Sequence, residues 1–429
     1  MDPSQLATGC QPPGFFAGMN QWEEWVLNFF PRFGDTLCRS MGGASPGGFP
    51  GWAIFLIMGI AGALIVVNIA ALGVPYVVLL ERKLLGRFHN RIGPNRVGIF
   101  GLAQPLADAV KLMTKEDVTP SAADKLMHAL APLVFAVPVV MMFAPIPWAD
   151  HTVMADLDIG ILYIVAVTTA AEVGVFMAGW ASNNKYSLFG AMRAVAMLVT
   201  YEVPLVLSIG SVAILAGTLN LSDIVRNQEY VPNLLFQPLG FLIFMIAVSA
   251  ELNRAPFDLL EADSELISGF HTEYSGMKWA LIQLGEYAAI IGFSAIIATL
   301  FFSGWKGPIF LPGYIWIFAK MGFIISGFIW IRATLPRMRV DQIMAFGWKF
   351  LLPLAFINLF VTAAEVIAYP NGLPEWLIPV NIGVAVVSVI GAAKLMNFKA
   401  DTRQLKFSST YVPPGDPVGD GVRVVARGG

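Results

Sequence analysis

Five acidic side chains fall within one short connection between two strongly apolar segments. The stretch from Arg254 to Lys278 holds them with no Lys or Arg between them: Asp258, Glu261, Asp263, Glu265 and Glu273. Carboxylates that share a partly buried, wet cavity repel one another, so their pKa values rise and their titrations become coupled. Such a cluster takes up and releases protons near neutral pH. An acidic docking face for a basic partner is the alternative, and the two interpretations are compatible.

A helical register would align most of this stretch. Arg254, Asp258, Glu261 and Glu265 are spaced at i, i+4, i+7 and i+11, which predicts one stripe along a helix, with Asp263 off it. Apolar neighbours favour burial of the segment: Phe257, Leu259, Leu260, Leu266, Ile267 and Phe270.

Further ionisable residues lie inside or at the ends of apolar segments: Glu172, Glu202, Glu251, Glu286 and Lys320. A charge at the centre of a membrane helix costs roughly 2.5–3.5 kcal/mol on insertion scales, which favours a functional role such as a proton relay. A polar group that binds a neighbouring helix is the alternative. Lys320 is a candidate counter-ion for one of the acids.

The composition indicates a membrane protein. Hydrophobic residues make up 56% of the 429 residues and charged residues 13%, whereas soluble domains carry about 25%. A net charge of −2 gives no indication of nucleic acid as a partner. Cys10 and Cys38 form no CxxC pair, so iron–sulfur ligation by this chain alone is excluded, and the four histidines show no metal-ligand spacing. Redox chemistry must therefore lie on a partner or on a lipid-soluble substrate.

The elements that position these residues are apolar helices. A spanning helix needs about 20 apolar residues, and nine stretches qualify: 52–80, 128–149, 159–180, 194–217, 235–252, 279–303, 312–334, 350–369 and 376–396. The sequence predicts an all-α, polytopic membrane protein with a single transmembrane domain, 51–397. An N-terminal extension, 1–50, and a C-terminal tail, 398–429, flank that domain.

Basic residues predict the orientation. Segment 81–127 contains eight Lys or Arg, segment 332–349 four and the tail from Lys394 six, whereas connection 150–158 has none. By the positive-inside rule, the N-terminus lies outside, while the C-terminus and the acid-rich stretch lie in the cytoplasm.

The connection after the first span contains an amphipathic segment. Its apolar face comprises Leu102, Leu106, Ala109, Val110 and Met113, and its polar face Gln104, Asp108, Lys111 and Lys115. Pro105 suits a first-turn position. The pattern predicts a helix in the membrane interface with an Asp108–Lys111 pair at i, i+3. A plain lipid anchor is the alternative.

Two stretches carry a family resemblance. "ERKLLGRFHNRIGPNRVGIFGLAQPLADAVKLMTKE" (81–116) and "NRAPFDLLEADSELISGFHTEYSG" (253–276) resemble the signatures of the H subunit of bacterial respiratory complex I, NADH:quinone oxidoreductase, the counterpart of mitochondrial NADH dehydrogenase subunit 1. Segments 182–204 and 330–354 resemble two further blocks of that family, and the resemblance runs from about 52 to 370. Membrane-bound hydrogenases contain a related subunit.

The resemblance implies a cofactor-free membrane subunit with quinone as substrate. Such a subunit forms the membrane-side wall of the quinone tunnel and docks the peripheral arm that carries FMN and iron–sulfur clusters. Its buried carboxylates begin a charged axis that leads to antiporter-like subunits in the bacterial cytoplasmic membrane.

The resemblance also implies residue roles. The quinone tunnel would use Glu81, Arg82, Asp108 and Lys111, and subunit docking would use Arg91, Arg96, Glu273 and Tyr274. Quinone reduction would perturb the acids from Asp258 to Glu265, and the acids inside the spans would pass the change into the membrane. A stand-alone proton or cation transporter and a structural anchor for a peripheral hydrogenase remain alternatives.

Overall fold

The computed structural model of the chain describes residues 51–150, 152–228, 231–258, 269–307, 312–370, 374 and 376–395. Three predicted relay acids lie outside the described residues, namely Glu261, Asp263 and Glu265, as do both cysteines, the N-terminal extension and the tail. The described part is helical, and no strand forms in it beyond one isolated bridge, Ala149–Thr152.

Nine long helices form most of the described part of the chain. In chain order they are α3 (Gly51–Phe88), α5 (Lys125–Met141), α6 (Gly160–Ala181), α7 (Lys185–Ala216), α10 (Pro238–Glu251), α12 (Gly276–Phe301), α13 (Gly313–Thr334), α15 (Leu352–Ala368) and α16 (Leu377–Leu395). Shorter helices are α4 (Gln104–Thr114), α8 (Leu221–Asn227), α9 (Asn233–Phe236), a 3-10 turn (Gly269–His271) and α14 (Val340–Phe346), which a π-helical turn (Gly347–Leu351) joins to α15.

Each predicted span coincides with a helix, and the prediction of an all-α polytopic membrane protein is confirmed. Among the described residues, six helices are long and apolar enough to cross a membrane, and α5 and α10 are shorter apolar helices. Three predicted boundaries are wrong. α3 ends at Phe88 rather than at residue 80, since the helix continues through the polar residues after Leu80. α7 begins at Lys185 rather than at residue 194, because the Asn184 side chain accepts a hydrogen bond from the main-chain N–H of Tyr186 and caps the helix. α5 ends at Met141 because Pro145 and Pro147 follow.

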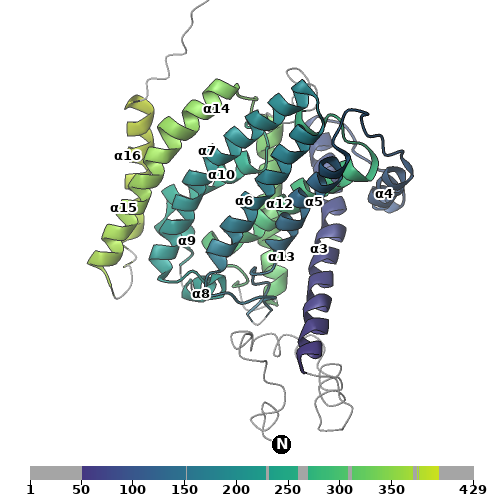
Figure 1. The fold of residues 1–429 in the computed structure, drawn as a ribbon. Helices are drawn as coiled ribbons and strands as arrows, with labels where there is room; N and C mark the ends of the chain where they lie inside the picture. The colour runs from purple at the N-terminus through teal and green to yellow at the C-terminus, as the bar shows by residue number, and fades with distance from the viewer. Residues whose placement is uncertain are drawn as a thin grey trace, which may run out of the picture.

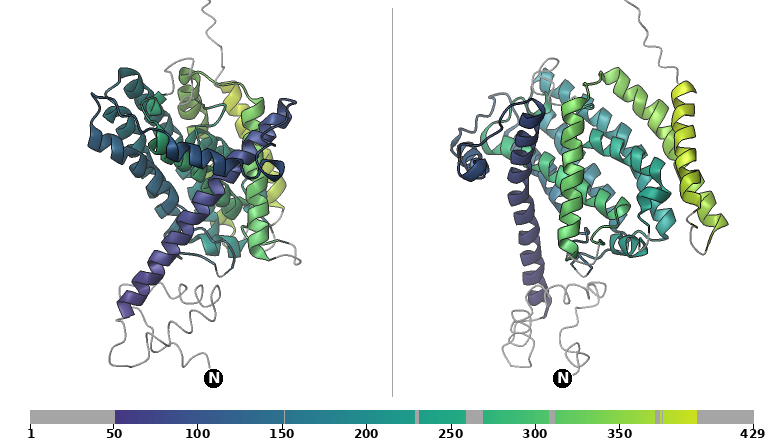
Figure 2. Two further views of the ribbon diagram at one scale, coloured as in Figure 1. Left: turned by 90° about the vertical axis from the view of Figure 1, so that its right-hand side faces the viewer. Right: turned by 180° about the vertical axis from the view of Figure 1, so that it is seen from behind.

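α12 lies at the centre of the bundle, where it contacts α3, α5 and α13 (Figure 1). Its apolar window is 78% buried, compared with 11% for α16, so α12 is a core helix and α16 a peripheral one. α6 packs tightly on α5, since a Cβ on Gly174 would lie 2.6 Å from the main-chain nitrogen of Phe135. α15 and α16 flank α7 and α10 on one side, and α3 lies on the opposite side (Figures 1 and 2).

α4 is the predicted amphipathic helix, and Pro105 lies in its first turn as expected. Its apolar side chains Leu106, Val110 and Met113 are exposed, whereas Asp108 is half-buried against the body of the protein. α4 lies beside α3 and α12. The predicted Asp108–Lys111 pair is wrong, because Asp108 binds a residue of α3 instead.

Candidate functional site

A buried ion pair links the two sequence motifs. The carboxylate of Glu81, near the end of α3, accepts a hydrogen bond at 2.9 Å from Arg254 and a second one from Arg332 of α13. Glu81 is only 4% exposed. The Arg254 guanidinium also lies over the ring of Tyr287, 4.7 Å from its centroid. Three segments far apart in the sequence therefore converge on one carboxylate.

Burial alone would lower the pKa of Arg254, but the neighbouring Glu81 carboxylate outweighs it and raises the pKa, so the guanidinium stays charged. Glu286 also acts electrostatically on Arg254. Arg254 therefore interacts electrostatically both with Glu81 of α3 and with an acid of α12.

The next two residues of α3 hold the first connection in place. Arg82 donates to Asp108 of α4 at 2.7 Å, and the Lys83 ammonium binds the main-chain oxygen of Phe100. Gln104 donates to the other oxygen of Asp108 at 3.1 Å. The Lys111 side chain is exposed, with no ion pair or hydrogen bond to a residue that the structure describes. Of the four predicted tunnel residues, Glu81, Arg82 and Asp108 are therefore brought together, and Lys111 stands apart.

The two motifs also meet at their far ends. The main-chain N–H of Val118 donates to the Ser275 hydroxyl at 2.9 Å. Lys278, in the first turn of α12, forms an ion pair of 2.9 Å with Asp117. The connection after α3 is therefore fastened to the segment before α12 at several points.

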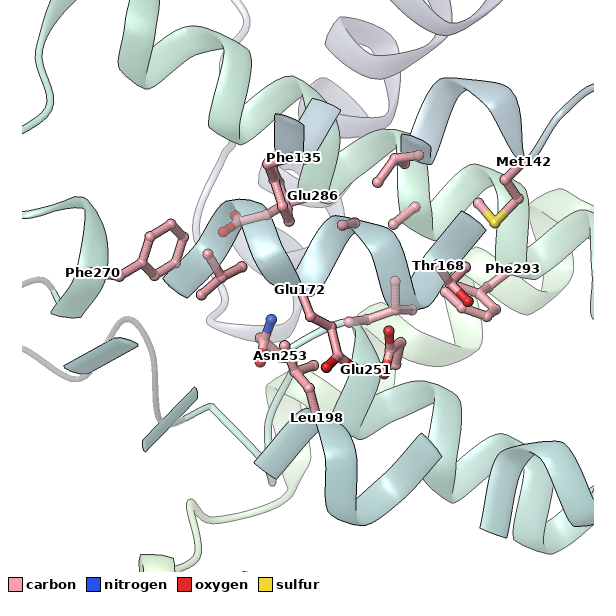
Figure 3. A pocket seen from close by; sticks show the side chains of 15 residues that line it. Phe135, Met142, Thr168, Glu172, Leu198, Glu251, Asn253, Phe270, Glu286 and Phe293 are labelled. Carbon is pink, nitrogen blue, oxygen red and sulfur yellow. The ribbon is translucent and has the colours of Figure 1, made fainter. Parts of the chain in front are cut away.

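An acidic cavity lies between residues of α5, α6, α7 and α12 and the end of α10 (Figure 3). It has a volume of ≈ 40 Å³, and its polar lining comprises Thr168, Glu172, Glu251, Asn253 and Glu286. A cavity needs roughly 10–15 Å³ to hold one water. Phenylalanine side chains of α5, α12 and the 3-10 turn form much of the remaining wall. Four of the predicted relay acids are thus in or beside one enclosure, since Glu202 acts electrostatically on Glu172 and Glu251.

Several oxygens of this enclosure have no partner in the part of the chain that the structure describes. No described residue donates to Glu172 Oε1, Glu251 Oε2 or Asn253 Oδ1, although all three atoms are buried. Figure 3 shows the side chains of Glu172 and Glu251 pointing toward each other. Glu202 accepts a hydrogen bond from Thr169 of α6. A buried carboxyl oxygen that lacks a protein donor either binds a proton or accepts a hydrogen bond from water. The cavity can therefore hold protons or water molecules.

The predicted helical stripe that starts at Arg254 is wrong at its beginning. Residues 254–258 form no helix, because Asn253 adopts a left-handed φ of 50° and Pro256 follows two residues after Arg254. Arg254 turns inward to Glu81, and Asp258 is half-buried in the loop beyond it. The stripe residues Glu261 and Glu265 lie outside the described residues.

Lys320 was expected to pair with an acid, but it binds main-chain oxygens instead. Its ammonium donates to the main-chain oxygens of Phe302, Gly304 and Lys306 at 2.6, 2.8 and 2.6 Å. No carboxylate of the described residues forms an ion pair with it. The lysine therefore fastens α13 to the turn that ends α12.

The four predicted docking residues fall into two groups. Arg91 and Arg96 are exposed on the connection after α3. Glu273 accepts a hydrogen bond at 2.7 Å from Asn184, and Tyr274 is buried and stacks on the ring of His128 with centroids 4.1 Å apart. The first pair is available to a partner, whereas the second pair makes contacts within the chain.

Sequence reasoning missed Arg332 as a partner of Glu81. The available signal was an arginine in the last turn of an apolar helix within the 330–354 block, but that residue served only to predict orientation. Its partner is 251 positions away and had no local signature.

Comparisons with known proteins agree with the resemblance of the motifs. The family model described as NADH dehydrogenase matches residues 61–363. A relative from Dehalococcoides mccartyi is 57% identical over 307 residues, which cover 72% of this chain and 86% of the relative. Relatives from Bacillus mycoides and Bacillus cytotoxicus are 50% and 48% identical over 317 residues, which cover 73% of this chain and 95% of each relative. All three carry the name of the H subunit of NADH-quinone oxidoreductase. The chain therefore belongs to the NADH dehydrogenase family, which includes the H subunits of NADH-quinone oxidoreductases.

Proposed function

We propose that the chain is the membrane subunit through which an NADH:quinone oxidoreductase couples quinone reduction to proton translocation. Reduction of a quinone to the quinol takes up two electrons and two protons. The chain would bind and guide the quinone, while FMN and iron–sulfur clusters on the peripheral arm supply the electrons. The names of its relatives support membership of such a complex.

One contact carries this proposal, the ion pair of Arg254 with Glu81. On one side of Arg254 lies the end of α3, with Arg82 holding α4. On the other side, Glu251 and Asn253 line the acidic cavity only a few residues earlier in the chain. A change of charge near the end of α3 thus reaches the cavity through one guanidinium, and low-dielectric surroundings preserve its strength.

Quinone would enter at the junction of α3 and α4. The isoprenoid tail of a quinone needs an apolar path, and Leu106, Val110 and Met113 expose such a surface on α4. The polar headgroup would lie nearer to Arg82 and Asp108, whose ion pair bridges the two helices at 2.7 Å. Lys111 would interact with the headgroup from the exposed side of α4.

The acids of the cavity would relay the electrical consequence of reduction. Glu172, Glu251 and Glu286 line one enclosure, and Glu202 acts electrostatically on it. Protonation of one member raises the tendency of its neighbours to ionise, because like charges repel. Asp258, with Glu261, Asp263 and Glu265, would be the first group to respond to quinone. The antiporter-like subunits of the complex would receive the change.

The exposed Arg91 and Arg96 suit the docking of a peripheral arm on the cytoplasmic side. Glu273 and Tyr274 would support that surface from within the chain. The positive-inside rule gives the same orientation, with the N-terminus outside and the C-terminus in the cytoplasm of a bacterial cell.

The proposal is tested with neutral substitutions in the assembled enzyme. Glu286→Gln and Glu251→Gln should each lower NADH:quinone turnover at least about tenfold, the effect of 1.4 kcal/mol on a barrier. The matched control is Asp341→Asn, because the Asp341 side chain is 87% exposed. NADH:quinone turnover of this variant should be normal. Normal turnover and pumping in both cavity variants would rule out the relay.

A further inference from the structure

A second cavity lies where α15 ends and α10 and α16 begin. The end of α15 and the start of α16 lie at the lower left of Figure 1. The volume of the cavity is ≈ 20 Å³. Five polar residues from three segments line it: Gln237, Asn358, Thr362, Glu365 and Asn381. Except for Glu365, which is half-buried, their side chains are more than nine-tenths buried. This cavity shares no lining residue with the acidic cavity described above.

Most hydrogen-bond donors around this cavity are engaged with the protein. The Gln237 amide donates to the main-chain oxygen of Ser211 at 3.0 Å and to the Thr362 hydroxyl at 3.3 Å. Thr362 donates to the main-chain oxygen of Asn358 at 2.9 Å, and Asn358 donates to the Ser211 hydroxyl at 2.8 Å. Asn381 donates to the main-chain oxygen of Phe236 at 2.8 Å and to Glu365 at 3.3 Å.

The oxygen atoms that line this cavity receive fewer hydrogen bonds than they can accept. Asn381 Oδ1 is buried in a residue that is 5% exposed, and no described residue donates to it. Within the same described ranges, no donor reaches Asn358 Oδ1, and Glu365 receives a hydrogen bond from Asn381 alone. No Lys, Arg or His of the described part pairs with Glu365. The lining therefore offers oxygens and one carboxylate without an opposing charge from that part of the chain.

A partner for these oxygens must be small, and a cation would bind several of them at once. The volume admits a guest about the size of one water. A monovalent cation would neutralise the single carboxylate of Glu365, whereas a divalent ion would leave an excess positive charge. Carboxylate and amide oxygens suit hard cations. We propose that this cavity binds a monovalent metal cation of sodium's size.

Two further observations fit such a site. Position 240 is a glycine, and a Cβ there would lie 3.0 Å from Asn358 Nδ2 and 3.5 Å from the Ser211 hydroxyl, inside the polar cluster. α16 is the least buried of the candidate spans, and Asn381 is its polar contact with Glu365 and Phe236. A bound cation would thus join α16 to α15 and α10.

The test is equilibrium binding of radioactive sodium to the purified, assembled complex in a choline buffer. The wild-type complex should hold one more sodium ion than the Glu365→Gln complex, and unlabelled sodium should displace it better than potassium. The matched control is Asp223→Asn on α8, outside the cavity, which should bind as much sodium as the wild type. The Asp223 side chain is 49% exposed and pairs with Arg226. Equal binding by the wild type and Glu365→Gln would overturn the proposal.

A second measurement needs no variant. A high-resolution map of the wild-type complex in sodium buffer should show a peak in this cavity whose oxygen neighbours lie closer than hydrogen-bond distance, which is about 2.7–3.0 Å. A peak with neighbours at hydrogen-bond distance identifies water and contradicts the proposal. An absent peak contradicts it as well. This measurement decides the matter even where Glu365→Gln fails to assemble.

Discussion

The Arg254 guanidinium lies 2.9 Å from the Glu81 carboxylate, although 173 positions separate the two residues in the chain. This contact joins the end of α3 to the loop after α10, and Arg332 of α13 binds the same carboxylate. The acidic cavity begins at Glu251 and Asn253, just before Arg254. One buried ion pair therefore connects the proposed quinone passage to the proposed proton relay.

The substitution Glu81→Gln should destabilise the chain. It leaves Arg254 and Arg332 facing each other without a carboxylate, and breaking a buried ion pair costs about 3–5 kcal/mol. The thermal inactivation midpoint of the complex and its content of this chain measure the effect. Arg82→Gln is the control, because the Arg82–Asp108 pair is 49% and 27% exposed. A midpoint for Glu81→Gln equal to that of the control would show that the buried pair contributes little.

The Arg82–Asp108 ion pair should position α4 for quinone. Asp108→Arg alone should raise the KM for quinone by up to about fivefold, because an exposed pair contributes about 0.2–1 kcal/mol. The double variant Arg82→Asp with Asp108→Arg restores opposite charges and should recover most of the loss. Steady-state kinetics at several quinone concentrations measure both. If the double variant is as impaired as the single one, the contact does not position α4.

Because α5 packs closely on α6, a side chain at position 174 should destabilise the protein. Gly174→Ala would place a Cβ 2.6 Å from a main-chain nitrogen, closer than real Cβ contacts. Overpacking typically costs about 1–3 kcal/mol, so the thermal midpoint should fall. Gly322→Ala in α13 is the control, because a Cβ there meets nothing within 4 Å. Equal midpoints for the two variants would contradict the close contact.

Lys320 should act as a structural clamp rather than as a counter-ion. Lys320→Met removes the donor for three main-chain oxygens and should lower stability by about 1–3 kcal/mol, the usual penalty for unsatisfied buried acceptors. The ratio of protons pumped to NADH oxidised should stay at its wild-type value. Lys349→Met, at an exposed position, serves as the control. A stable Lys320→Met complex with a reduced pumping ratio would instead support the relay role first expected from the sequence.

The helices of the bundle were predictable because the signal is local. Runs of about 20 apolar residues mark membrane spans whatever their partners are. The position of Pro105 in the first turn of α4 was equally local, since proline lacks the N–H that an inner turn needs. The irregular backbone after α10 also had a local signal, because Pro256 interrupts the helical register that the acidic spacing suggested.

The partners of the charged residues were not predictable in the same way. Asp108 could pair with Lys111 on its own helix or with Arg82 on α3. The position of α4 against α3 brings Asp108 to Arg82. The sequence places several acids inside the spans as possible partners for Lys320, yet its ammonium binds main-chain oxygens of the turn that ends α12. Both outcomes depend on how helices rotate and pack, which no short stretch of sequence specifies.

The most direct measurement of the proposed coupling is the infrared difference spectrum of the assembled complex between oxidised and reduced quinone. Neutral and ionised carboxyl groups absorb at different frequencies, so a proton gained or lost by a cavity acid appears as a band. Reduction should produce a carboxyl band in the wild type that is missing in Glu172→Gln and in Glu251→Gln. The same band at full size in both variants would contradict the claim that these acids respond to quinone reduction.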